Sequence, residues 1–130
     1  MNIQWYPGHM TKTRRQIEAD LGQVDMVAEI VDARIPISSR NPDIDAIVGA
    51  KPRLVVLNRA DQADPAGNRF WTKAFQDQGF AVLETDSKTG KGVSRFSEVS
   101  RVLLKEQIQR WQAKGQVGRP IRAMVVGVPN

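Results

Sequence analysis

The sequence contains no cysteine, one histidine and one tyrosine, and its apolar runs are all far too short to cross a bilayer. Without cysteine, the chain has no disulfide, no thiolate metal site and no cysteine nucleophile, which fits a reducing cytosol. The first charged side chain is Lys12, so the N-terminus lacks the basic-then-apolar layout of a secretory signal. These absences predict a soluble, cytoplasmic protein.

Positive charge is unevenly distributed along the 130 residues. Residues 1–100 hold 13 basic and 13 acidic side chains, whereas residues 101–130 hold six basic and one acidic, which accounts for the net charge of +5. A hydrophobic content of 41% with 25% charged residues is that of one globular domain. The basic side chains of the C-terminal segment predict either a nucleic-acid-facing surface or an ordinary solvated helix face; they are Arg101, Lys105, Arg110, Lys114, Arg119 and Arg122.

Apolar periodicity predicts strands and helices that alternate along the chain. Strands are expected at 24–32, 53–58, 80–85 and 121–127, and helices at 10–21, 43–49, from Pro65 to Gly79, and at 93–114. The order Asp64-Pro65 is that of an N-cap followed by a first-turn proline. Because the strands are continuous apolar runs, we predict an α/β fold, a mostly parallel sheet with helices on both faces.

Four large aromatic side chains are expected in the core, where the helices pack on this sheet: Phe70, Trp71, Phe75 and Phe96. Trp5 and Tyr6 are better candidates for a contact surface. Each predicted strand ends in a polar or glycine-rich turn, and the carboxyl ends of parallel strands form one ligand-binding edge. At the first turn, Asp32 and Arg34 could form a structural ion pair or face a ligand, and we favour the ion pair.

The turn Asn58-Arg59-Ala60-Asp61 matches N-K-x-D, the guanine-reading element of GTPases, with arginine in the lysine position. The carboxylate of Asp61 can accept hydrogen bonds from guanine N1 and N2, donors that adenine lacks at those positions. Asn58 would bond the base edge and brace neighbouring loops, and Arg59 would cover one face of the base. The alternative is a turn whose side chains satisfy only local backbone groups.

The next turn, Asp86 to Gly92, resembles the second base-contacting loop of GTPases, in which the backbone of Ser87 would donate to guanine O6 beside Asp86 and Lys88. Taken alone, the segment is better explained as a simple turn built on Gly90 and Gly92. The last predicted strand runs into Gly127, which has the position of the first glycine of a phosphate loop continuing through Pro129 and Asn130. The lysine and hydroxyl of such a loop are absent, so the sequence is expected to be a fragment and inactive by itself.

The order of these motifs resembles the circularly permuted GTPases of the ribosome biogenesis GTPase A (YlqF-like) family, because NRAD and DSKTGKG precede GVPN. The segments WYPGHM and VDARIPISSRNP are also similar to that family, so the resemblance covers essentially the whole chain. Residues 1–130 would then be the N-terminal part of a permuted P-loop GTPase domain, ending inside the phosphate loop. The resemblance implies binding of GTP and GDP, with Mg²⁺ ligands beyond residue 130, and GTP hydrolysis coupled to assembly of the large ribosomal subunit and its rRNA.

The resemblance also assigns a catalytic role to His9, as the residue that positions the attacking water. Without it, a histidine at a helix start more often satisfies local hydrogen bonds or lies on an RNA surface. The competing function is a non-enzymatic rRNA-binding module with a vestigial nucleotide site. No metal site is expected within the chain, and its oligomeric state is left open.

Overall fold

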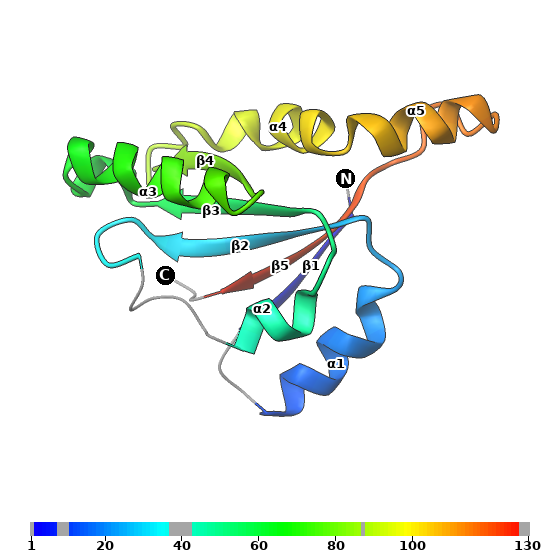
Figure 1. Ribbon diagram of the computed structural model, residues 1–130, viewed down its shortest axis with the longest axis horizontal. Helices are drawn as coiled ribbons and strands as arrows, with labels where there is room; N and C mark the ends of the chain where they lie inside the picture. The colour runs from blue at the N-terminus through cyan, green and yellow to red at the C-terminus, as the bar shows by residue number, and fades with distance from the viewer. Residues whose placement is uncertain (1, 8–10, 37–42, 87, 128–130) are drawn as a thin grey trace.

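The computed structural model describes residues 2–7, 11–36, 43–86 and 88–127, which form one parallel sheet of five strands in the order β1-β5-β2-β3-β4 (Figure 1). The elements follow one another along the chain as β1 (Asn2–Pro7), α1 (Thr11–Leu21), β2 (Met26–Asp32), α2 (Asp43–Val48), β3 (Arg53–Asn58), the 3₁₀ turn η1 (Ala60–Gln62), α3 (Pro65–Asp77), β4 (Ala81–Thr85), the 3₁₀ turn η2 (Val93–Arg95), α4 (Phe96–Leu103), α5 (Lys105–Ala113) and β5 (Arg122–Gly127).

The predicted parallel α/β fold is confirmed, with one strand more than the sequence indicated. Strand β1 pairs with β5 in the register Asn2 with Arg122 through Pro7 with Gly127. The four predicted strands correspond to β2, β3, β4 and β5. A short edge strand whose partner lies more than a hundred residues away has no local sequence signal of its own, because pairing with that partner is what stabilises it.

Helices cover both faces of the sheet, as predicted. Figure 1 shows α4 and α5 along one side and α1 and α2 on the other. Ile17 of α1 packs in one apolar cluster with Val27 and Met124. Phe75 of α3 packs on the same face of the sheet as Val27, as the alternation of side chains along the strands indicates. Leu104 packs with Met26 on the opposite face.

One helix and one aromatic side chain differ from the prediction. The helix expected over residues 93–114 is divided at Leu104 into α4 and α5. The hydroxyl of Ser100 donates to the Phe96 carbonyl oxygen at 2.7 Å, a bond that bends helices, and Leu104 is fully buried at the bend. Phe70 is 64% exposed and is therefore not a core residue, because α3 turns it away from the sheet. Its ring stands edge-on to that of Trp71 with 5.1 Å between the centroids.

The other three predicted core aromatics contribute to the core. Phe75 is 1% exposed, and Trp71 and Phe96 are half-buried and pack against the apolar clusters. The predicted cap of α3 is also present, since the Asp64 carboxylate accepts a 3.2 Å hydrogen bond from the amide of Ala66. This cap makes α3 begin a few residues after the end of β3, beside the turn that follows that strand.

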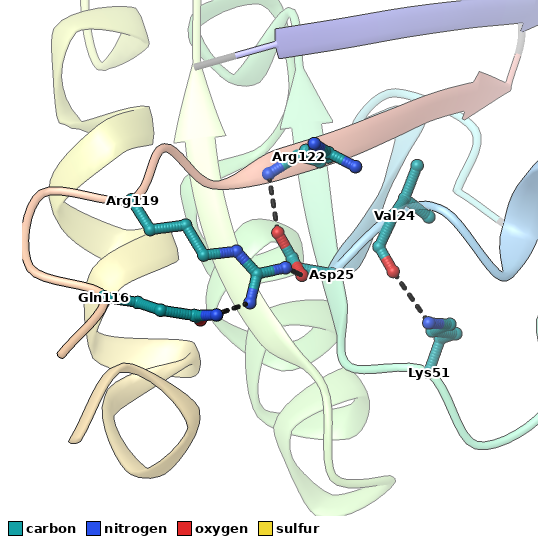
Figure 2. A network of polar contacts seen from close by, with 6 residues as sticks. All are labelled: Val24, Asp25, Lys51, Gln116, Arg119 and Arg122. Carbon is teal, nitrogen blue, oxygen red and sulfur yellow. Dashed lines mark hydrogen bonds and ion pairs between the residues drawn. The ribbon is translucent and has the colours of Figure 1, made fainter. Parts of the chain in front are cut away.

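A polar network holds the start of β5 at the end of the sheet where β2 also begins (Figure 2). The backbone amide of Asp25 donates to the Arg122 carbonyl oxygen at 2.8 Å, and the Arg122 amide donates to the Asp25 carboxylate at 2.8 Å. The Arg119 guanidinium also bonds this carboxylate at 3.1 Å and lies 4.0 Å from the ring centroid of Trp111. Arg119 therefore holds the connector before β5, although it belongs to the basic segment.

A buried ion pair lies within the sheet. Glu29 of β2 and Arg53 of β3 are 1% and 3% exposed, and 3.3 Å separates the Arg53 Nη1 from the Glu29 Oε1. The same Nη1 bonds the carboxylate of Asp45 on α2, and the guanidinium lies 4.5 Å from the ring centroid of Phe80. The arginine thus ties two strands and α2 together through charge-assisted bonds.

Candidate functional site

The carboxyl ends of β5, β2, β3 and β4 lie side by side along one edge of the sheet. Asp32 is level with Asn58, Asn58 is level with Thr85, and Gly127 is level with Ile30. The described parts of the four predicted turns therefore share one edge. This edge is where parallel α/β sheets bind ligands.

Asn58, at the end of β3, links this strand end to those of β2 and β4. It is 5% exposed, and its amide oxygen accepts a 3.2 Å hydrogen bond from the Thr85 hydroxyl. Its carbonyl oxygen accepts a 2.8 Å bond from the Ala33 amide in the turn after β2. The bracing role predicted for Asn58 is thus visible in the fold, and three neighbouring strand ends are joined through this one residue.

The turn after Asn58 presents a carboxylate to solvent. Arg59 has φ 58°, the only positive φ among the described residues other than glycine, and this left-handed backbone starts η1. The buried Asn68 of α3 holds the turn by donating to the Ala60 carbonyl oxygen at 2.9 Å. Asp61 is exposed, and within the described part of the chain its carboxylate makes no hydrogen bond. Its oxygens are therefore available to a ligand.

Asp86, in contrast, uses its carboxylate to shape its own loop. One oxygen accepts from the Lys88 amide at 3.0 Å and the other from the Thr89 hydroxyl at 2.7 Å. The Thr89 bond is the main reason that the pKa of Asp86 is held below its ordinary value, with the backbone amides and the charge of Lys88 acting in the same direction. Asp86 therefore orders the loop, from which the exposed Lys88 projects.

Two glycines at this edge allow close backbone approaches that other residues would prevent. At Gly127, φ is 127° and a Cβ would lie 2.3 Å from the carbonyl oxygen of Ile30 on β2. At Gly92, φ is 84° and a Cβ would lie 2.3 Å from the carbonyl oxygen of Glu84. Both positions therefore require glycine, because a side chain there would collide with a backbone carbonyl oxygen.

The predicted ion pair at the end of β2 is present. The Arg34 Nε and Nη2 donate to the two carboxylate oxygens of Asp32 at 3.0 and 2.7 Å, and the Arg34 amide donates to the same carboxylate at 2.9 Å. These bonds lower the pKa of Asp32, first through the side-chain bond to Arg34, and the nearby charge of Arg59 adds to the shift. The two arginines thus favour the ionised form of the Asp32 carboxyl group.

A cavity of about 630 Å³ lies beside the turns that follow β3 and β4, the two turns predicted to contact the base. Its lining comes from η1, α3, β4, the loop that follows β4 and η2, and includes Asp61, Arg69 and Arg95. No residue of β2 or β5 lines it, although these strands form the middle of the binding edge. The cavity therefore lies along the free edge of β4, away from Gly127.

Four of the predicted site residues lie outside the described residues: His9, Ser87, Pro129 and Asn130. Within the described ranges, no three histidine, cysteine, aspartate or glutamate side chains group as metal ligands. No helix in the same ranges is long and apolar enough to cross a membrane.

Two residues that hold the candidate site were not predicted. Thr85 and Asn68 each carry one hydrogen bond that positions the turn after β3. The only available signal for Thr85 was its place at the end of a predicted strand, level with Asn58 once the strands are aligned. Asn68 had no such signal, because its role depends on the packing of α3 beneath the turn.

Comparison with known proteins relates the whole chain to ribosome-associated GTPases, although no family model matches it. The chain is 50% identical over 131 residues to ribosome biogenesis GTPase A of Priestia megaterium, covering 100% of this chain and 46% of that protein. It is 34% identical over 128 residues to mitochondrial ribosome-associated GTPase 1 of Mus musculus, covering 98% of this chain and 38% of that protein. The chain thus spans less than half the length of these relatives.

A solved structure supports the same relationship. The crystal structure of GNP-bound YlqF from T. maritima matches with a TM-score of 0.60 and 31% sequence identity. The match covers 92% of this chain and 43% of the YlqF chain. The resemblance drawn from the motif order is therefore confirmed by both sequence and fold.

Proposed function

We propose that this chain, which is similar over its whole length to ribosome biogenesis GTPase A, is the base-reading part of a circularly permuted GTPase domain acting in assembly of the large ribosomal subunit. The observation that carries the proposal is the turn Asn58-Arg59-Ala60-Asp61, because it combines a braced asparagine with an exposed carboxylate that has no hydrogen-bond partner among the described residues. Gly127, two strands away, supplies the start of the phosphate loop.

Guanine selection follows from the chemistry of Asp61. Its two oxygens accept from N1–H and the N2 amino group of guanine, whereas adenine would leave the carboxylate unpaired. The stem and planar head of Arg59 cover one face of the base, and the Asn58 amide bonds the base edge. In the loop that Asp86 orders through its bonds to Lys88 and Thr89, the amide of Ser87 is proposed to donate to guanine O6.

The phosphate half of the site begins at Gly127 and continues through Pro129 and Asn130. Backbone amides of such a loop donate to phosphate oxygens. Hydrolysis of GTP is proposed for the full-length protein, because the chain spans less than half the length of the relatives that are named GTPases. Mg²⁺ is proposed to be held by ligands beyond residue 130 together with phosphate oxygens of the nucleotide, since this ion usually takes one or two protein ligands and keeps several waters.

His9 is proposed as the residue that positions the attacking water, on the strength of the WYPGHM segment. A neutral imidazole can accept a hydrogen bond from water and can take up a proton near neutral pH. The carboxyl end of β1 is level with Gly127, so His9 follows two residues after the strand that flanks the phosphate loop. This placement in sequence and register supports a role near the terminal phosphate.

The partner is proposed to be the precursor of the large ribosomal subunit, including its rRNA, and this role would place the protein in the cytoplasm. Arg101, Lys105, Arg110 and Lys114 are exposed on α4, α5 and the residue after them, and could contact rRNA phosphates. The same surface favours the alternative of an rRNA-binding module with a vestigial nucleotide site. The alternative predicts salt-dependent RNA binding without measurable affinity for GTP.

Isothermal titration of the full-length protein with GTP and ATP tests the proposal. We expect GTP to bind and ATP to bind at least about 100-fold more weakly, because the Asp61 site rejects a base without the two donors. Equal affinities would overturn the reading of Asp61, and absence of binding to either nucleotide would favour the alternative.

A specificity exchange provides the second test. In Asp61→Asn, the amide N–H can donate to the C2 carbonyl of xanthine while its oxygen still accepts from N1–H, so preference should move from GTP to XTP. Asp77→Asn, at the far end of α3, is the matched control and should keep GTP preference. Unchanged preference in Asp61→Asn would contradict the proposal.

A further inference from the structure

The strand order constrains where the middle of a bound nucleotide lies. Strand β2 separates β3, which carries the base-reading turn, from β5, which ends at Gly127. Neighbouring strands are about 4.8 Å apart, so the ends of β3 and β5 are separated by about 10 Å. A nucleotide with its base at Asp61 and its terminal phosphates beyond Gly127 must therefore cross the end of β2.

The residues at the end of β2 include a fixed, solvent-facing cation. Asp32 is level with Asn58, and the side-on ion pair with Asp32 uses the Nε and Nη2 of Arg34. The Arg34 side chain is 41% exposed, and within the described residues its Nη1 makes no hydrogen bond. The guanidinium is thus held in place by one carboxylate while part of its donor array stays open to solvent.

We propose that Arg34 contacts the phosphate nearest the ribose, the α-phosphate, and that Asp32 is a positioning residue for this contact. The inference rests on the proposed function, because it requires a guanine nucleotide running from β3 to β5. A planar guanidinium with open N–H groups suits a tetrahedral phosphate, and prior fixation by Asp32 reduces the side-chain entropy lost on binding. The ion pair would thereby stabilise the turn after β2 and also hold Arg34 in position for the phosphate.

The cavity along β4 offers the competing location for the phosphates. If the base at Asp61 were oriented outward, the phosphates would lie in that cavity, where Arg69 and Arg95 are the lining arginines. The two locations require different arginines, so one set of substitutions separates them. Arg95→Met is therefore the matched comparison for Arg34→Met.

The test measures displacement of a fluorescent GDP analogue from the full-length protein by guanosine, GMP and GDP. Arg34→Met should weaken GMP and GDP about 10-fold and leave guanosine unchanged, because only the former carry the α-phosphate. Arg34→Lys should weaken the binding of GMP and GDP less than Arg34→Met does, because lysine keeps the positive charge but lacks the parallel N–H donors of the guanidinium. Asp32→Asn should weaken GMP and GDP without affecting guanosine, and Arg95→Met should change none of the three.

Three results would overturn the inference while leaving the proposed function intact. Unchanged GMP affinity in Arg34→Met would show that the guanidinium does not reach a phosphate. Equal losses for guanosine and GMP would show that the ion pair only supports the base site. A loss of GDP affinity in Arg95→Met, with Arg34→Met unaffected, would place the phosphates along β4. If the wild-type protein bound no guanine nucleotide, the proposed function itself would fail.

Discussion

The hydroxyl of Thr85 donates a 3.2 Å hydrogen bond to the amide oxygen of Asn58, which ties the end of β4 to the end of β3. Both side chains are buried, at 5% exposure each. The two loops proposed to read guanine follow directly from these two residues. The pairing of β3 with β4 and this side-chain contact thus hold the starts of the two loops side by side within the protein itself.

Thr85→Val should lower the free energy of unfolding by about 1 kcal/mol, because it removes a donor from a buried acceptor while keeping the side-chain volume. GTP affinity of the full-length protein should fall as well, since the two loops lose their link. Urea denaturation and nucleotide titration measure the two effects. Thr72→Val, which removes an exposed 3.3 Å bond to Glu84, is the control and should change stability by less than about 0.5 kcal/mol.

Gly127→Ala should destabilise the fold by about 3 kcal/mol, because the added Cβ would lie 2.3 Å from a backbone oxygen at a φ of 127°. Gly22→Ala is the control, since a Cβ there meets no atom within 4 Å. Thermal denaturation of both variants gives the comparison. Similar melting temperatures for the two would mean that the end of β5 is not packed against β2 as described.

Arg53→Met should cost about 3–5 kcal/mol of stability, because the buried Glu29 would lose its ion-pair partner. Replacing both residues with apolar ones, as in Glu29→Leu with Arg53→Met, should restore much of the loss. Chemical denaturation of the two single variants and the double variant gives the coupling energy. Additive effects would contradict a direct interaction between the two side chains.

The loop after β4 should lose stability in acid through Asp86. Its folded-state pKa is lower than its unfolded-state pKa, so the carboxylate stabilises the fold above the unfolded value and this contribution disappears as the pH falls through the folded value. Asp86→Asn should therefore show a shallower acid limb in thermal denaturation below about pH 5, where the unfolded-state carboxyl begins to take up its proton. An acid limb identical to that of the wild type would mean that Asp86 is not held by Thr89 and Lys88 in solution.

His9→Ala in the full-length protein should reduce GTP turnover by about 100-fold, a size typical of losing a group that handles the attacking water or its proton. GDP affinity should stay within about twofold, because His9 is not proposed to touch the base or the α-phosphate. Single-turnover hydrolysis and GDP titration separate the two quantities. A comparable loss of nucleotide affinity would indicate that the histidine supports the fold and not the reaction.

Local signals in the chain predicted much of the fold. Continuous apolar runs such as residues 54–57 of β3 could be assigned to buried strands because both faces of a parallel sheet are covered. The pair Asp64-Pro65 predicted the start of α3, because capping depends on residues adjacent in sequence. The exposed Phe70 was predicted wrongly, since helical spacing alone did not define the width of the apolar face.

Residue types and their spacing were enough to predict the motif order, the strand-end turns and the resemblance to ribosome biogenesis GTPase A, because each of these is a pattern along the chain. The packed fold was needed to show that β1 lies beside β5, that Thr85 braces Asn58, and that the ion pair of Arg34 stands between the two halves of the proposed site. These relationships join segments distant in sequence. They arise from strand order and register, which are set by packing of the whole sheet and leave no local pattern to read.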